Sequence, residues 1–418
     1  MRHQPRHYLL TPVGSAGDVH PFLGIGRELR RRGQRVTLLA AEPFRDSAQR
    51  ADLDFVACWS NEYVDAVIQD PDLWHPRRGL KVIMGAVAAS LRDTYGALSR
   101  LYEPGRTVLV GHTLSFATRS FEEKYEVPAA TLHLAPGLLR SLRRLPAVAP
   151  GRDISGLPRP LKRAFWWLGD RIFIDPHILP ALNAWRGELG LRPVRRPFQS
   201  WLHSPRATLG LFPEWFGLPQ PDWPPQVRLT GFPLFDDDGA ESLSPALERF
   251  LASGAPPIVF TPGSANRQAP HFFQAAIAAT ACLDRRAILL TRFAEQLPHR
   301  LPDSVLHVDW VSLSRLLPAC AGIVHHGGIG TCAQGLAAGV PQLLMPMGFD
   351  QPDNAVRLRR LGVGDLLPPE RFTARRLARK LAALIERPSV TARCRQLRGE
   401  AGSYDGIRQT CELLESLR

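Results

Sequence analysis

Residues 8–40 decide the fold and read YLLTPVGSAGDVHPFLGIGRELRRRGQRVTLLA. Tyr8–Val13 has the apolar pattern of a short buried strand, and residues 14–18 form a glycine-containing turn. Pro21–Arg32 carries its apolar residues on one helical face, and Arg35–Ala40 predicts the next strand. A strand, a helix and a strand in this order form a βαβ unit, which implies a parallel sheet with helices on its faces.

The same alternation of strands and helices continues through both halves of the chain. Further strands are expected at 55–57, 107–111, 129–133, 208–212, 228–231, 258–261, 287–291, 305–308, 322–325 and 342–345. Helices are expected at 81–101 and 115–125, outside the sheet within 134–206, and from 373 to the end. The stretch 236–256 is the most linker-like. The sequence therefore predicts an α/β protein with two Rossmann-like, doubly wound domains.

Length and composition agree with two folded domains. The chain has 418 residues, of which 44% are hydrophobic and 22% charged, as in ordinary soluble proteins. These values exclude a disordered chain, a collagen and a disulfide-stabilised miniprotein. The six cysteines form no Cys-x-x-Cys pair, so we expect reduced thiols and no cysteine-built zinc site.

The net charge is strongly positive, at +13. Nucleic acid, an anionic membrane or a phosphorylated substrate would each suit this charge. The arginines are scattered without a basic arm, so no nucleic-acid partner is expected. The N-terminal residues lack a signal-peptide core, and no stretch of about 20 residues is apolar enough to span a bilayer. We therefore expect a cytoplasmic protein that could lie on the inner membrane as a peripheral protein.

The motif richest in chemistry is His325-His326-Gly-Gly-Ile-Gly-Thr-Cys-Ala-Gln334. It follows an apolar strand and opens a helix, so its glycines let a ligand approach the backbone closely. The unpaired N–H groups and the positive dipole of a helix N-terminus favour phosphate. Asp350 and Gln351 follow the next strand at its carboxyl end, where ligands bind in open α/β sheets. A carboxylate and an amide there suit several hydroxyl groups.

Two ligand interpretations of this motif stay open, besides a glycine turn that serves packing alone. Gly328-Ile-Gly330-Thr-Cys-Ala333 matches the GxGxxA pattern of dinucleotide-binding enzymes, and an acidic residue follows about 20 residues later. This match would make the chain an NAD-dependent oxidoreductase. The paired histidines at the turn, and the position of the motif in the second half of the chain, favour a different phosphate-bearing ligand.

The turn after the first strand offers candidate bases. Asp18 could be the N-cap of the following helix, which is worth about 1 kcal/mol. It could instead act as a general base, since an ordinary carboxylate is ionised at pH 7 and can take a proton from an attacking hydroxyl. His20, two residues on, is the rival base. Ser264 follows a strand in Thr261-Pro-Gly-Ser, where it could donate to a phosphate oxygen or belong to an ordinary turn.

Together these motifs resemble the nucleotide-sugar glycosyltransferases of family 1, which have the GT-B fold. Residues 325–331, Gly339-Val340-Pro341 and Asp350-Gln-Pro-Asp-Asn354 are similar to the donor-binding signature of that family. Gly14-Ser-Ala-Gly-Asp-Val-x-Pro21 resembles the branch with sterol and antibiotic glycosyltransferases, in which an aspartate replaces a histidine base. Shorter motifs such as Thr230-Gly-Phe-Pro-Leu-Phe235 resemble the rhamnosyltransferases that form mono-rhamnolipids.

The resemblance implies two domains that face a central cleft. Residues 1–238 would bind the acceptor, residues 239–400 would bind the nucleotide-sugar, and a helix in 401–418 would pack back on the first domain. It implies an inverting transfer without metal or cofactor, with Asp18 as the catalytic base and His20 as its rival. The implied donor-binding residues are Ser264, Trp310, Val311, His325, His326, Gly327, Gly328, Gly330, Thr331, Gln334, Asp350 and Gln351. The implied acceptor-binding residues are Ser15, Ala16, Gly17, Trp74, Phe116 and Trp166.

The leading substrate pair implied by the resemblance is dTDP-L-rhamnose and a 3-(3-hydroxyalkanoyloxy)alkanoic acid, which would give a mono-rhamnolipid. The alternative is UDP-glucose with a sterol or polyketide-like aglycone, because His325-His326-Gly-Gly matches the sterol glucosyltransferases. In many members of the family that this chain resembles, a glutamate at the position of Gln334 binds the two ribose hydroxyls. A glutamine at this position suits a donor with deoxyribose. The basic helix that contains Trp166-Trp167 also predicts peripheral contact with an anionic membrane.

Overall fold

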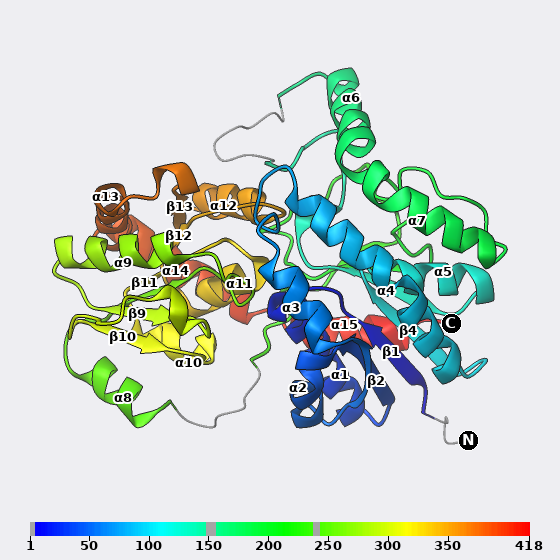
Figure 1. The fold of residues 1–418 in the computed structure, drawn as a ribbon, viewed down its shortest axis with the longest axis horizontal. Coiled ribbons are helices and arrows are strands. Elements are labelled where there is room, and N and C mark those ends of the chain that lie inside the picture. Colours follow the sequence, from blue (N-terminus) through cyan, green and yellow to red (C-terminus); the bar gives the residue numbers. More distant parts are fainter. Residues whose placement is uncertain (1–4, 148–155, 237–242) are drawn as a thin grey trace. The chain divides into compact units, whose positions relative to one another are not determined.

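The computed structural model describes residues 5–147, 156–236 and 243–418, which divide into two compact units (Figure 1). Unit 1 comprises Met1–Pro146, Asp153–Phe235 and Asp405–Arg418. Unit 2 comprises Ala147–Arg152 and Asp236–Tyr404. The predicted boundary at 238/239 lies outside the described residues. Among the described helices, none is long and apolar enough to cross a bilayer.

Unit 1 is built on a parallel sheet with the strand order β3-β2-β1-β4-β5-β6-β7 in the described part of the chain. The strands are β1 (His7–Thr11), β2 (Arg35–Ala41), β3 (Asp54–Trp59), β4 (Thr107–His112), β5 (Ala129–His133), β6 (Ala207–Gly210) and β7 (Val227–Leu229). Every residue of β1, β4 and β5 is buried. Both faces of these three central strands are therefore covered, which explains why they are mainly apolar.

Helices cover the sheet of unit 1. They are α1 (Ala16–Arg31), α2 (Arg45–Arg50), α3 (Asn61–Gln69), α4 (Gly79–Leu101), α5 (Phe116–Tyr125), α6 (Arg159–Gly169), α7 (Asp175–Glu188) and α15 (Gly406–Glu415), with a π-helical segment η3 (Asp170–Ile174) between α6 and α7. Leu98 of α4 and Phe121 of α5 pack on Leu9 and Leu109 of the sheet. The C-terminal helix α15 lies beside α1, as the red and blue helices of Figure 1 show.

Unit 2 is a second parallel sheet, with the order β10-β9-β8-β11-β12-β13 among the described residues. Its strands are β8 (Ile258–Thr261), β9 (Ala287–Leu290), β10 (Val305–Val308), β11 (Gly322–His325), β12 (Gln342–Leu344) and β13 (Gly364–Leu366). Its helices are α8 (Pro245–Ala252), α9 (Pro270–Cys282), α10 (Leu313–Leu316), α11 (Ile329–Ala338), α12 (Gln351–Arg360), α13 (Ala374–Ile385) and α14 (Pro388–Gly402). The predicted α/β class with two doubly wound domains is confirmed.

Both sheets contain a point where the strand order reverses. In unit 1 the reversal lies between β1 and β4, and in unit 2 it lies between β8 and β11. Ligands of doubly wound sheets bind at the carboxyl ends of the strands beside such a point. The turns after these four strands are therefore the places to look for a site.

Candidate functional site

Asp18 lies in the first turn of α1, directly after the turn that ends β1. Its Oδ2 accepts hydrogen bonds from the backbone N–H of Ser15 at 2.8 Å and from Ser15 Oγ at 3.3 Å. Ser15 is the N-cap, and Asp18 closes a capping box from the third helical position. The predicted N-cap position of Asp18 and the predicted helix start at Pro21 are therefore wrong, because this box starts the helix at Ala16.

Gly14 makes room for this carboxylate. Its φ is +134°, a conformation that favours glycine, and a Cβ at this position would overlap Asp18 Oδ2. The glycine turn therefore fixes where the Asp18 side chain lies.

His112 faces Asp18 from the carboxyl end of β4. Its Nε2 lies 3.9 Å from Asp18 Oδ1. Its Nδ1 accepts a hydrogen bond from the backbone N–H of Leu114 at 3.3 Å, so the proton of the neutral ring lies on Nε2. Burial lowers the pKa of His112 to about 4, so this ring is neutral at physiological pH. Sequence analysis did not single out His112. The available signal was a histidine at the end of the apolar strand predicted at 107–111.

The other predicted residues of unit 1 divide into two groups. Ser15, Ala16 and Gly17 form the start of α1 next to Asp18. His20 is half-buried against the ring of Phe235 and, two residues along the helix, does not share a face with Asp18.

The predicted aromatic acceptor residues lie apart from this turn in the sequence. Trp74 is half-buried between α3 and α4. Phe116 is 1% exposed and belongs to the apolar core of α4, α5 and α7. Trp166 holds α6 in place, because its Nε1 donates to the carbonyl of Ser141 at 3.3 Å. Phe116 therefore packs in the core of unit 1, and Trp166 fastens α6 to the segment around Ser141.

The glycine turn of unit 2 joins β11 to α11, with Gly328 as the N-cap. A Cβ on Gly328 or on Gly263 would collide with the ring of His326, so this ring packs against both turns at the reversal point. Gly327 has a φ of +100° and lies against Gln351. Gly330 and Thr331 stand in the half-buried first turn of α11, where backbone N–H groups are unpaired.

The two histidines of the motif differ in their surroundings. His325 is fully buried, with Nε2 hydrogen-bonded to Gln342 Oε1 at 3.0 Å and Nδ1 accepting from the N–H of Gly327 at 3.2 Å. It therefore supports the turn from inside the domain. His326 Nδ1 has no hydrogen-bond partner among the described residues. Burial lowers the pKa of His326 to about 4, so the ring is neutral and can donate one hydrogen bond to a ligand.

Asp350 and Gln351 begin α12 and meet the glycine turn through Asn354. Asn354 Nδ2 donates to Asp350 Oδ2 at 2.7 Å and to the carbonyl of Gly327 at 3.0 Å. Burial raises the pKa of Asp350 to about 6. Gln351 Oε1 accepts from the N–H of Met347 at 2.8 Å, which leaves its amide N–H₂ as the group to offer a ligand. Asn354 is a connecting residue that sequence analysis quoted without assigning it a role.

Asp236 lies at the start of the stretch that the sequence predicts as most linker-like, and two side chains hold it next to Gln334. Its Oδ1 accepts from Gln334 Nε2 at 3.0 Å, and its Oδ2 accepts from Ser312 Oγ at 2.5 Å. The serine hydroxyl and the glutamine amide bind both of its oxygens.

The remaining predicted residues of unit 2 lie at the carboxyl ends of β8 and β10. Ser264 is exposed in the turn after β8, and Trp310 and Val311 follow β10, both half-buried. Arg267 is a missed candidate in the loop after β8: its guanidinium lies 4.5 Å from the ring centre of Phe293, and its Nε has no partner among the described residues. In the part of the chain that the structure describes, no group of three His, Cys, Asp or Glu residues could hold a metal.

Comparisons with known proteins identify the family. The C-terminal domain of the erythromycin biosynthesis protein CIII-like family matches residues 275–412. The chain is 33% identical to the O-mycaminosyltylonolide 6-deoxyallosyltransferase of Streptomyces fradiae, over 97% of this chain and 96% of the relative. The chain belongs to this family of GT-B glycosyltransferases.

Further comparisons agree with that assignment. This glycosyltransferase is 44% identical to the aklavinone 7-beta-L-rhodosaminyltransferase of Streptomyces galilaeus over a short segment, 28% of this chain and 26% of the relative. The glycosyltransferase of kitacinnamycin shares the fold with a TM-score of 0.72, at 22% identity over 99% of this chain and 98% of that one. The spinosyn rhamnosyltransferase complexed with thymidine diphosphate has a TM-score of 0.68, at 18% identity over 97% and 98%. The glycosyltransferase class predicted from the motifs is confirmed.

Proposed function

We propose that this glycosyltransferase transfers a 6-deoxyhexose, with inversion, from a dTDP-linked donor to a hydroxyl group of a hydrophobic polyketide-type acceptor. The observation that carries the proposal is the Asp18 carboxylate, which Ser15 fixes at the reversal point of the first sheet with His112 opposite. This position suits a general base for an acceptor hydroxyl.

The reaction would be a single displacement at the anomeric carbon. Asp18 takes the proton of the acceptor hydroxyl while that oxygen bonds to the anomeric carbon, and the bond from this carbon to the diphosphate breaks. The N–H groups at the start of α11 and the neutral ring of His326 stabilise the charge that develops on the diphosphate. Asp350 and the Gln351 amide bind sugar hydroxyls.

Gln334 supports a deoxyribose nucleotide. Its amide donates to Asp236, and no carboxylate stands at this position to accept from two ribose hydroxyls. The complex of the spinosyn rhamnosyltransferase with thymidine diphosphate agrees with this nucleotide. Ser264 and the Trp310-Val311 pair would complete the nucleotide site.

The relatives favour a polyketide-type acceptor. One is named for 6-deoxyallosyl transfer to O-mycaminosyltylonolide and another for rhodosaminyl transfer to aklavinone. Rhamnosyl transfer to a 3-(3-hydroxyalkanoyloxy)alkanoic acid is the second candidate, favoured by the short ordered motifs such as Thr230–Phe235. Neither relative named above refers to a lipid or sterol acceptor, and membership of this family argues against an NAD-dependent oxidoreductase.

Replacement of the base tests the proposal. We expect Asp18→Asn to lower kcat by about 10²- to 10⁴-fold, the range for loss of a general base. The asparagine oxygen can still accept from Ser15, so the fold and dTDP affinity should change little. Asp52→Asn, with a side chain 83% exposed, is the matched control. Full activity of Asp18→Asn would show that another group is the base.

Isothermal calorimetry with dTDP, UDP and NAD tests the donor. Selective binding of dTDP is expected; a preference for UDP would move the proposal to a glucosyl donor and leave the role of Asp18 unchanged. Assays with a macrolide aglycone and a hydroxyalkanoyloxyalkanoic acid, both with dTDP-L-rhamnose, separate the two acceptor candidates. Binding of NAD alone would overturn the proposed function.

A further inference from the structure

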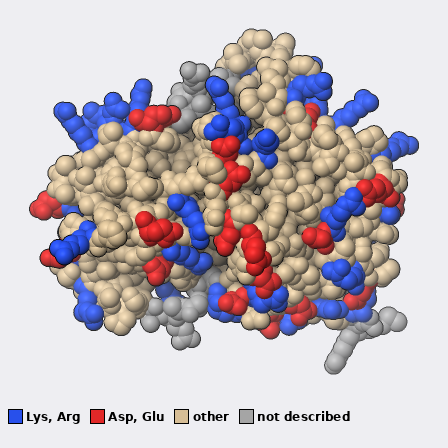
Figure 2. Space-filling view, viewed as in Figure 1, with Lys and Arg blue, Asp and Glu red and all other residues tan. Residues whose placement is uncertain are grey.

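Residues 157–173, which contain α6 and most of η3, carry an apolar outer surface that we call the α6 surface. Among the described residues, nine large hydrophobic side chains are exposed, and six of them lie in this short segment. The six are Leu157, Leu161, Trp167, Leu168, Ile172 and Phe173. In Figure 2 the tip at the top of the view, where Figure 1 places α6, is tan and carries no acidic side chain.

Helix α6 and the start of η3 bury polar side chains on their inner face. Lys162 and Asp170 are 5% and 1% exposed, and with Trp166 they follow a four-residue spacing along one buried face. Lys162 Nζ donates to the carbonyl of Arg143 at 2.8 Å, and Asp170 accepts two hydrogen bonds from Arg140, at 2.8 and 2.6 Å. An ordinary surface helix has the opposite arrangement. The polar contacts therefore hold α6 so that its apolar side chains point outward.

The exposed charges of the α6 surface are all positive. Arg159, Arg163 and Arg171 are exposed, and the only acidic residue of 156–174, Asp170, is buried against Arg140 and Arg196. Apolar side chains, a tryptophan and arginines together suit the boundary between lipid headgroups and acyl chains of an anionic bilayer. The aliphatic stems of arginine can lie along the apolar surface while the guanidinium groups reach lipid phosphates.

We propose that the α6 surface docks on an anionic membrane. Leu161, Leu168 and Ile172 enter the acyl boundary, and the three exposed arginines bind lipid phosphates. A two-fold dimer through the same surface would place arginine against arginine, so charge complementarity favours lipid over a second copy. This inference goes beyond the proposed function and does not depend on it. Membrane binding would bring the enzyme to the lipid phase, in which hydrophobic acceptors dissolve.

Vesicle flotation with the full chain tests the proposal. The probes are vesicles of phosphatidylcholine alone and vesicles of equal parts phosphatidylcholine and phosphatidylglycerol. We expect the protein to float with the anionic vesicles at least tenfold more than with the neutral ones. The triple variant Leu161→Glu/Leu168→Glu/Ile172→Glu should lose this binding, whereas Leu218→Glu, an equally exposed leucine outside the α6 surface, should retain it.

The arginines give a second, graded measurement. Each change of Arg159, Arg163 or Arg171 to Gln should weaken binding to anionic vesicles about fivefold and reduce its salt dependence. Sugar transfer to a soluble acceptor should be unchanged in all these variants, which separates this proposal from the proposed function. Absence of flotation with both vesicles, or equal loss in Leu218→Glu, would overturn the proposal. So would a dimer in light scattering that the triple variant abolishes, because the surface would then be an interface between copies.

Discussion

At the scale of single residues, the base role proposed for Asp18 can be tested through its neighbour His112. The Leu114 N–H and burial give His112 one tautomer and one charge state, neutral with the proton on Nε2. His112 Nε2 lies 3.9 Å from Asp18 Oδ1, which is too far for a hydrogen bond but close enough for the polar ring to act electrostatically on the carboxylate. We therefore expect His112 to position Asp18 rather than to act as a second base.

Replacement of His112 by phenylalanine should lower kcat while leaving KM for the donor nearly unchanged. The variant keeps the ring that packs edge-on against Phe22 but removes the Nε2–H that faces Asp18. We expect a loss of about 10- to 100-fold, smaller than for the base itself. Steady-state kinetics across pH provide the measurement, since a positioning role also shifts the acidic limb of the pH profile.

His133→Phe is the matched control for that experiment. His133 is a fully buried histidine of the neighbouring strand β5, hydrogen-bonded to Thr113 at 2.7 Å and His203 at 2.8 Å. Its replacement also removes a buried neutral imidazole, yet no hydrogen bond or ion pair between it and Asp18 is found among the described residues. An equal loss of activity in His112→Phe and His133→Phe would show that His112 contributes only to packing.

At the scale of elements, the apolar strands were the most predictable parts. The bounds of β5, β8, β10 and β11 coincide with their predictions, because each strand is a short, mainly apolar run with loop residues on both sides. β13 escaped prediction, since Gly364–Leu366 is short and centred on an aspartate. The start of α1 and the contacts of Asp236 depend on hydrogen bonds of single side chains. A periodic pattern of apolar residues does not reveal such bonds, so these features could not be predicted.

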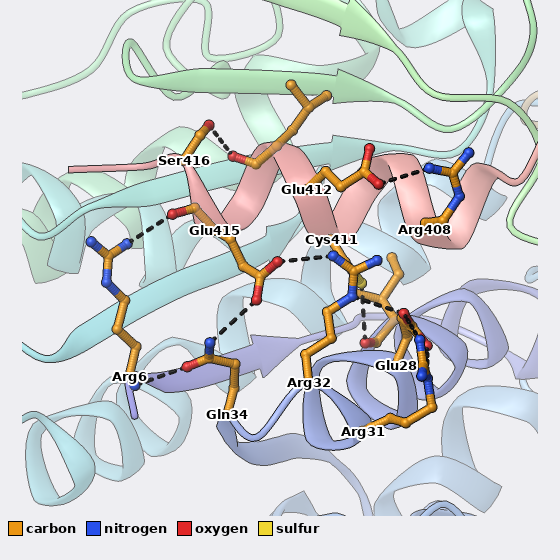
Figure 3. A network of polar contacts seen from close by, with 12 residues as sticks. Arg6, Glu28, Arg31, Arg32, Gln34, Arg408, Cys411, Glu412, Glu415 and Ser416 are labelled. Carbon is orange, nitrogen blue, oxygen red and sulfur yellow. Dashed lines mark hydrogen bonds and ion pairs between the residues drawn. The ribbon is translucent and has the colours of Figure 1, made fainter. Parts of the chain in front are cut away.

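The C-terminal helix α15 gives a prediction at this scale. Figure 3 shows Glu415 between Arg32 and Gln34, but Glu415 is half-exposed, and such ion pairs contribute about 0–1 kcal/mol. Leu414, in contrast, is fully buried. Leu414→Ala should therefore lower the free energy of unfolding by about 2–5 kcal/mol, while Glu415→Gln changes it by less than about 1 kcal/mol. Urea denaturation measures both; a larger effect of Glu415→Gln would mean that the polar network holds the helix.

At the scale of the whole molecule, the two units differ in their buried titratable groups. Burial lowers the pKa values of four histidines of unit 1: His7, His112, His133 and His203. In unit 2 the same applies to His325 and His326, but there burial also raises the pKa of Asp350 to about 6. A group with a lowered pKa binds fewer protons in the folded state, so its contribution to stability is lost as the pH falls from about 6.5 toward 4. A carboxyl group with a raised pKa acts in the opposite direction.

Acidification should therefore destabilise unit 1 before unit 2. At pH 5, a buried histidine with a pKa of about 4 has lost about 2 kcal/mol of its contribution, and several together approach the stability of a domain. Glu122 and Asp175 have raised pKa values and oppose this in unit 1, but four histidines outweigh two carboxyl groups. Hydrogen exchange at pH 7 and pH 5 measures the effect, with protection lost first in β1, β4 and β5. His203→Gln should reduce the difference, because that position no longer takes up a proton on unfolding; equal protection of both sheets at pH 5 would contradict the prediction.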